Sequence, residues 1–164
     1  MIVVSDTTPL ISLMKAARLD LLGSLFQEVL IPNAVYSELT TNPNFAEEAE
    51  QIKNCPFIRV VSVKEQKAVD VLRRSAGLDL GESEAIVYAD DVKADVLLMD
   101  EARGRQVAKS MGLYIMGTVG VLLFAYEEKI LTGADVEEAL NKLRKANRHI
   151  SEEIFKYALN KIQN

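Results

Sequence analysis

Acidic side chains recur in this chain where strands are expected to end. Asp6 comes soon after the apolar run Met1 to Val4, and Asp100 follows the apolar run Val96 to Met99. Short apolar runs of this kind are typical of buried strands. Ligands of open α/β sheets bind outside the carboxyl ends of the strands. If the two strands are neighbours, Asp6 and Asp100 should therefore face one crevice.

Three glutamates could join this pair. Glu38 lies within the helix expected after the second strand, and Glu82 and Glu84 lie in the first turns of the helix expected before the fourth. Mg²⁺ and Mn²⁺ prefer hard oxygen ligands. Carboxylates close together repel, so at least one pKa should rise without a metal, and a divalent cation removes that penalty. Such a cation can generate hydroxide from water and neutralise phosphate charge, which requires neither His nor Cys.

Each acid also has an ordinary structural interpretation. Asp100, followed by Glu101, could cap the helix behind it, an effect worth about 0.5–2 kcal/mol. Glu82 and Glu84 could simply favour a helix N-terminus, at about 0.3–1 kcal/mol each. Glu38 could be a solvent-facing helix residue. Only the ordered set favours a metal site over these alternatives.

The elements that must position these acids alternate between strands and helices. Strands are predicted at Met1–Val4, Val29–Ile31, Phe57–Val63, Val96–Met99 and Tyr114–Met116. Helices are predicted from a Thr8 cap, from Pro32, within Asn42–Asn54, at Lys64–Ser75, about Gly81–Lys93, Glu101–Met111 and Val119 to about Lys129, with two more in Asp135–Asn164. This alternation predicts a parallel sheet with helices on both faces. We expect a single domain over residues 1–164, with an α/β core at 1–130 and a helical extension at 131–164 packed on it.

Composition and sequence motifs exclude several functional classes for this protein. The chain has 164 residues, 49% of them hydrophobic, and a net charge of −5, which argues against a DNA reader with a broad basic face. It lacks a Walker A sequence and a G-x-G-x-x-G sequence. The lone Cys55 excludes an internal disulfide. The apolar stretch Val119 to Tyr126 is far shorter than the ~20 residues of a membrane span. We expect a cytoplasmic protein with no membrane partner.

The segments around the four main acids resemble those of the PIN-domain family, which includes the VapC-type toxins of toxin–antitoxin systems. The matching segments are IVVSDTTPLISL around Asp6, IPNAVYSEL around Glu38, GLDLGESEAIVYA around Glu84 and ADVLLMDEARGR around Asp100. The later segment GLYIMGTVGVLLFAYEEKIL is similar to one PIN-like subgroup that has a helical C-terminal extension.

This resemblance implies a three-layer α/β/α sandwich with a five-stranded parallel sheet, plus C-terminal helices. It also implies a metal-dependent endoribonuclease that cleaves RNA phosphodiester bonds with Mg²⁺ or Mn²⁺. Asp6, Glu38, Glu84 and Asp100 match the catalytic positions. Of these, Asp6, Glu84 and Asp100 are the expected metal ligands, and Glu38 and Glu82 are further candidates. Many family members form homodimers, and toxin members are held inactive by an antitoxin protein.

Two departures from the family pattern leave alternatives open. The third acid is commonly Asp but here is Glu84, and Glu82 could act instead of it or beside it. A further acid often follows the fourth, whereas here Glu101 is directly adjacent to Asp100, which leaves a second metal site open. A catalytically degenerate PIN-like module that binds RNA or protein is therefore the rival hypothesis.

Candidate substrate-binding residues surround the expected site. Thr7 follows Asp6, and Arg103 and Arg105 follow Asp100 on one helix. Basic side chains there could hold RNA phosphates. A second basic group lies near the end of a later helix, where its ordinary role is to favour the helix dipole. It comprises Lys142, Arg144, Lys145 and Arg148.

Overall fold

The protein folds around a five-stranded sheet in which all the strands run parallel. The computed structural model describes residues 1–163, and the strand order is β3-β2-β1-β4-β5. The strands are β1 (Val3–Ser5), β2 (Val29–Pro32), β3 (Ile58–Val61), β4 (Val96–Leu98) and β5 (Ile115–Met116). The expected α/β/α class is confirmed, because the chain crosses over through helices between successive strands.

Helices make up most of the rest of the chain. They are α1 (Thr7–Lys15), α2 (Asp20–Phe26), α3 (Asn33–Thr41), α4 (Ala46–Lys53), α5 (Gln66–Ala76), α6 (Leu80–Asp91), α7 (Ala102–Ser110), α8 (Thr118–Glu127), α9 (Gly133–Lys145) and α10 (Glu152–Gln163), with a 3₁₀ turn at Pro43–Phe45. Among residues 1–163, no helix is long and apolar enough to cross a membrane.

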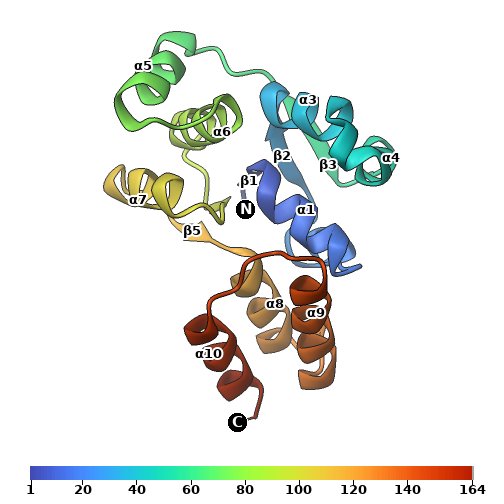
Figure 1. Ribbon diagram of the computed structural model, residues 1–164. Helices are drawn as coiled ribbons and strands as arrows, with labels where there is room; N and C mark the ends of the chain where they lie inside the picture. The colour runs from blue at the N-terminus through green and yellow to red at the C-terminus, as the bar shows by residue number, and fades with distance from the viewer. Residues whose placement is uncertain (164) are drawn as a thin grey trace.

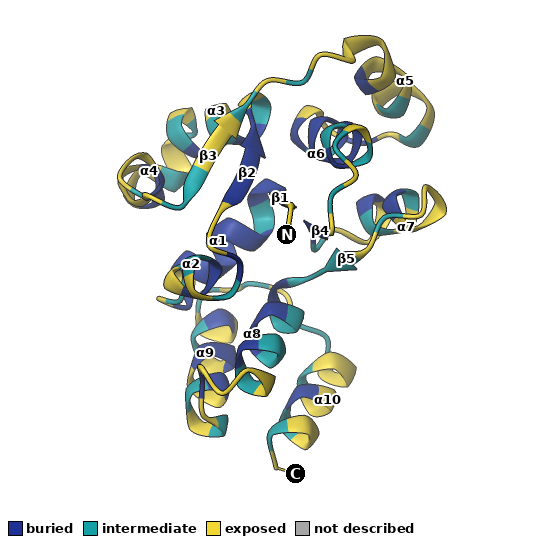
Figure 2. Ribbon diagram, turned by 180° about the vertical axis from the view of Figure 1, so that it is seen from behind, coloured by how far each residue is buried: buried dark blue, intermediate teal, exposed yellow. Residues whose placement is uncertain are grey.

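The two faces of the sheet bury separate apolar clusters, because successive side chains on a strand point to opposite faces. Val3, Ile31 and Leu98 point into the larger cluster, which α1, α2, α3, α8 and α9 cover. Val4 and Leu97 point into the smaller cluster, which contains residues of α6 and α7. Figure 1 shows α5, α6 and α7 on one side of the sheet and α1, α3 and α4 on the other. Figure 2 shows α6 largely buried and α5 largely exposed.

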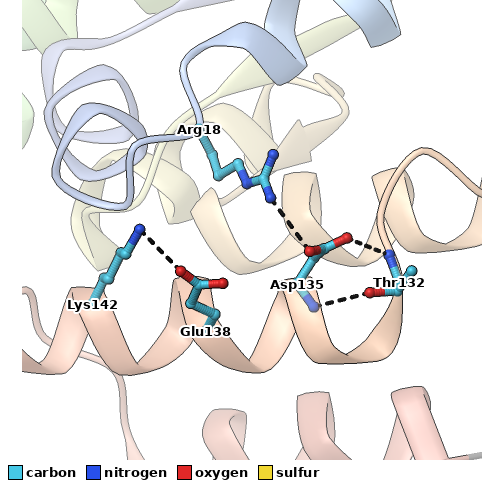
Figure 3. Close-up of polar contacts among 5 residues, drawn as sticks. All are labelled: Arg18, Thr132, Asp135, Glu138 and Lys142. Atoms are coloured by element: carbon cyan, nitrogen blue, oxygen red, sulfur yellow. Dashed lines mark hydrogen bonds and ion pairs between the residues drawn. The ribbon is translucent and has the colours of Figure 1, made fainter.

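The C-terminal helices share the larger cluster with the sheet. Leu122 of α8, Leu140 of α9 and Ala158 of α10 are all buried there. At the start of α9, Thr132 Oγ1 accepts a hydrogen bond from the Asp135 N–H at 3.1 Å, and Asp135 Oδ2 accepts one from the Thr132 N–H at 2.9 Å (Figure 3). This reciprocal capping box fixes the first turn of α9.

Polar contacts also tie α9 to other parts of the fold. Asp135 Oδ1 lies 3.5 Å from Arg18 Nη2, which joins α9 to the connection between α1 and α2 (Figure 3). The second basic group is largely engaged in polar contacts, either within α9 or between elements. Lys142 pairs with Glu138, Arg144 pairs with Glu152, and Arg148 donates to Ser12. These contacts favour the structural interpretation of that group.

Some predicted boundaries were wrong. Helix α1 begins at Thr7 with Asp6 in the N-cap position, so Thr8 is not the cap and Pro9 occupies the third position. Proline is tolerated there because the first N–H groups of a helix lack intrahelical acceptors. Helix α2 was not predicted from the sequence. It has no side-chain cap and spans only seven residues, so its local signal is weak.

Candidate functional site

The candidate site lies at the carboxyl edge of the sheet, where β1 is the central strand. Ser5 pairs with Leu98 in the β1–β4 ladder, and the Asp6 N–H donates to the Leu98 carbonyl at 3.0 Å. Asp6 directly follows β1, and Asp100 lies two residues beyond β4. Chain order reverses at β1, so this edge is the topological switch point at which open α/β sheets bind ligands.

Asp6 and Glu38 meet across a space beside Gly81. A Cβ placed on Gly81 would lie 3.6 Å from Asp6 Oδ1 and 3.5 Å from Glu38 Oε2. Thr7 Oγ1 donates to Glu38 Oε2 at 3.0 Å, which orients the glutamate from α1. The missing side chain of Gly81 thus leaves a space between the carboxylate of Asp6, which directly follows β1, and that of Glu38 on α3, with a Val35 methyl group as its third neighbour.

Burial makes ionisation of Asp6 unfavourable. Its side chain is almost fully buried, and desolvation is the largest cause that raises its pKa to about 8. The Thr7 backbone N–H opposes this shift, while the charges of Asp79, Glu82 and Glu38 add to it. A buried carboxyl with like-charged neighbours is the arrangement that a bound cation relieves.

Helix α6 brings two further acids to Asp6. Asp79 is its N-cap and accepts from the Glu82 N–H at 2.8 Å. Burial, followed by the Asp79 charge, raises the pKa of Glu82 to about 7. Asp79 was missed from the sequence, although an Asp three residues before a Glu is a helix-start signal that could have identified it.

Glu84 points to a different place from Glu82. It is buried, and its Oε1 accepts from the Ala34 N–H at 3.1 Å. The N-cap of α3 is Pro32, which has no side-chain oxygen to offer. Glu84 therefore satisfies a free backbone donor in the first turn of α3, close to the end of β2.

Asp100 makes a similar contact with α8. Its Oδ1 accepts from the Thr118 N–H at 2.7 Å, and its Oδ2 accepts from the Thr118 hydroxyl at 2.6 Å. A Cβ on Gly117 would lie only 2.9 Å from Oδ1, so the close approach depends on glycine. The alternative in which Asp100 caps the helix behind it is wrong, because Glu101 is the N-cap of α7 and the Asp100 carboxylate binds α8.

Comparison with known proteins assigns the chain to a family. A family model described as a PIN domain matches residues 2–164. The chain belongs to the PIN-domain family. No curated protein and no solved structure gives a significant match to it. The family is one of a nuclease-like fold, and the match confirms the resemblance seen in the sequence segments.

The candidate substrate-binding residues of this PIN domain differ in exposure. Thr7 is buried, and its hydroxyl donates a hydrogen bond to Glu38. Arg105 Nη1 donates to the Met99 carbonyl at 2.8 Å, which supports the turn after β4. Arg103 is exposed, and its Nη1 donates to the Ala76 carbonyl at 3.1 Å. Arg103 is thus the one of these three whose side chain is exposed, and it contacts the connection that leads to α6.

The acids of this PIN domain suit a cation that keeps part of its water shell. Within residues 1–163, no three His, Cys, Asp or Glu side chains lie as a group that could hold a metal. Mg²⁺ is usually bound through one or two protein carboxylates, several waters and substrate phosphates. The space between Asp6 and Glu38 provides two such hard oxygen donors, so the donor set fits Mg²⁺ or Mn²⁺.

Proposed function

We propose that this PIN domain is an endoribonuclease that depends on Mg²⁺ or Mn²⁺. The observation that carries the proposal is the pair of carboxylates, Asp6 and Glu38, on either side of the space left by Gly81 at the switch point of the sheet. Phosphodiester hydrolysis with a hard cation needs oxygen ligands beside a surface that a polyanion can reach. This edge of the sheet supplies the ligands.

The side chains of this site would have different roles. Asp6 and Glu38 would hold the cation, and the Thr7 hydroxyl keeps Glu38 in place. Glu82 adds negative charge next to Asp6. When bound, the cation supplies Lewis acidity and neutralises charge that develops on the phosphodiester. Arg103 would bind a phosphate of the RNA, since its guanidinium is exposed and can donate further hydrogen bonds.

In this proposal Glu84 and Asp100 would have a positioning role, because each holds the first turn of a helix. They hold the first turns of α3, which carries Glu38, and of α8 through Ala34 and Thr118. A carboxylate offers about four lone-pair positions, so either residue could also bind a cation while keeping these hydrogen bonds.

RNA cleavage in Mn²⁺ tests the proposal directly. We expect cleavage by the wild type, loss of cleavage in Asp6→Asn, and cleavage by Asp91→Asn, which changes an exposed carboxylate at the far end of α6. The three proteins differ by at most one charge, so a general charge effect is controlled. Equal cleavage by the wild type and Asp6→Asn would overturn the proposal.

The second candidate function is a PIN-like module that binds RNA or protein without catalysis. It is favoured by the absence of a three-acid group in residues 1–163 and by the engagement of Glu84 and Asp100 with helix ends. Metal titration separates the two candidates. A cation present at about 100 times its Kd stabilises the folded state by about 2.7 kcal/mol if it binds that state alone. No change in Tm with Mn²⁺ would favour the binding module.

A role as the toxin of a toxin–antitoxin pair extends the nuclease proposal. Membership of the PIN-domain family supports this role. The same proposal includes action in the cytoplasm, assembly as a homodimer and inhibition by an antitoxin protein. We expect expression of the wild type to arrest growth and expression of Asp6→Asn to leave growth unchanged. Normal growth with both proteins would contradict the toxin role while leaving RNA cleavage to be decided in vitro.

A further inference from the structure

Helix α5 ends in two arginines that have no part in the apolar core. Arg73 and Arg74 occupy its last turn and are exposed, and Val69 is the only buried residue of the helix. Basic residues in the last turn interact favourably with the helix dipole, which is their ordinary role. That role requires no particular surface around the two arginines. A second role in ligand binding would require a suitable surface, so their surroundings decide whether they have this second role.

The charges of these arginines have no carboxylate partner within residues 1–163. The ion pairs of that part of the chain use other cations, among them Arg18, Arg59 and Arg144. Arg74 Nε only reaches the Asp70 carbonyl, at 3.5 Å, and Arg103 reaches the Ala76 carbonyl. Within residues 1–163, none of the three guanidinium groups around the end of α5 forms an ion pair, and each keeps most of its donors free of the hydrogen bonds just described.

A hollow adjoins these side chains. It has a volume of about 660 Å³ and is lined by Asp70, Arg73, Arg74, Gly77 and Leu78. Gly77 turns the chain with a left-handed φ of +67°, and a Cβ there would lie 2.7 Å from Arg103 Nη1. The turn thus brings the α7 arginine against the same connection. The Asp70 carboxylate also lines the hollow, so an anion there must approach from the arginine side.

The connection from α5 to α6 links this hollow to the acidic site. Gly77 and Leu78 line the hollow, Asp79 caps α6, and Gly81 faces Asp6 and Glu38. Four residues of chain span at most about 14 Å, so the hollow and the acids lie within a few nucleotides of one strand. Figure 1 shows α5, α6 and α7 together at one end of the molecule, away from α9 and α10.

We propose that the hollow at the end of α5 is a second RNA subsite, in which Arg73 and Arg74 bind backbone phosphates of the strand that enters the acidic site. The identity of the ligand rests on the nuclease function proposed above. The net charge of −5 and the acids beside Asp6 repel a polyanion, so the strand needs unpaired cations outside the acidic site. The two arginines provide them without contributing to the cation site.

The salt dependence of RNA binding measures this contact. The test follows the fluorescence anisotropy of a labelled single-stranded oligouridine over a KCl series in EDTA, where cleavage is blocked. Each phosphate contact contributes about 0.7 to the slope of log K against log salt for a single strand, so Arg73→Gln/Arg74→Gln should make the slope shallower by about 1.4. Arg73→Lys/Arg74→Lys should keep the slope of the wild type.

Lys145→Gln/Lys156→Gln is the matched control. It removes the same charge from two exposed side chains on α9 and α10 and should leave the slope unchanged. Thermal melts check that each variant folds. If the glutamine pair does not fold, Arg73→Gln and Arg74→Gln are measured singly, each with an expected change of about 0.7.

The outcomes separate the subsite from the nuclease. The subsite is wrong if the arginine variants keep the slope of the wild type, if the lysine control changes as much, or if the wild type does not bind RNA in EDTA. Mn²⁺-dependent cleavage by the wild type would leave the nuclease assignment standing in each of these cases. A shallower slope in the arginine variants without any cleavage by the wild type would support the subsite and overturn the nuclease assignment.

Discussion

Replacing Asp6 by Asn should change how the stability of the metal-free protein depends on pH. The carboxyl of Asp6 is almost fully buried, and burial together with Asp79, Glu82 and Glu38 raises its pKa from 3.8 to about 8. In the unfolded chain the same carboxyl ionises near its ordinary pKa. Between these two values the folded state therefore holds a proton that the unfolded state has released.

The sign and the size of the effect follow from this difference. A raised folded-state pKa gives stability that is complete below about pH 4 and is lost as the pH rises through about 8. Over that window one extra proton in the folded state lowers the free energy of unfolding by about 1.4 kcal/mol per pH unit. From about pH 5 to about pH 7 the wild type should thus lose roughly 2.7 kcal/mol through Asp6. Asp6→Asn cannot ionise and should lack this loss.

Urea denaturation in EDTA at several pH values measures the effect. Other groups titrate in both proteins, so the difference between the two stability curves isolates Asp6. We expect Asp6→Asn to gain on the wild type as the pH rises and to be at least as stable near neutrality. Asp91→Asn, which changes an exposed carboxylate, should follow the wild type. Parallel curves for Asp6→Asn and the wild type would refute the inference that Asp6 is protonated in the folded protein.

Three further tests separate binding of a cation from stabilisation of the fold. Gly81→Ala places a Cβ in ordinary van der Waals contact with the two carboxylates. It should raise the free energy of unfolding in EDTA by up to about 1 kcal/mol, yet reduce the rise in Tm caused by Mn²⁺. An unchanged response to Mn²⁺ would show that the cation does not use this space. Glu84→Ala should lower the free energy of unfolding by about 1–3 kcal/mol, and Glu84→Gln by less because its amide oxygen can still accept at α3; equal losses in urea denaturation would contradict the capping role. Thr118→Val should destabilise by about 0.5–3 kcal/mol and couple to Asp100→Asn in a double-mutant cycle, and a coupling energy near zero would argue against the contact.

The sequence predicted where the acids enter the site but not which way they point. Asp6 and Asp100 were recognisable because each follows a short apolar run that is typical of a buried strand. Their positions at the ends of β1 and β4 are confirmed by the parallel register of the two strands. A short apolar run is a local property of the sequence, so local patterns place the ends of these two strands to within one residue.

Helix α6 shows why the rest could not be predicted. Glu82 and Glu84 are two residues apart, so their side chains leave the helix about 200° apart and face different neighbours. Which of them faces Asp6 depends on how α6 packs against β1 and α3, and no local pattern specifies that packing. In the fold Glu82 carries a charge felt by Asp6, while Glu84 reaches the first turn of α3.

Contacts across long stretches of chain were equally inaccessible. Asp100 binds Thr118, which is 18 residues away and begins α8. The structural alternative that the sequence offered for Asp100 was a cap on the nearer helix, because nearby helix starts are the only ones that a local pattern can connect to an acid. Such a pairing becomes visible only when β4, β5 and α8 are placed side by side.

A crystal soaked in Mn²⁺ tests the central claim most directly, because anomalous scattering locates the ion against each carboxylate. We predict a peak within coordination distance of Asp6 and Glu38, in the space beside Gly81. A soaked crystal without a peak there, or with the ion between other acids such as Glu84 and Asp100, would contradict the account.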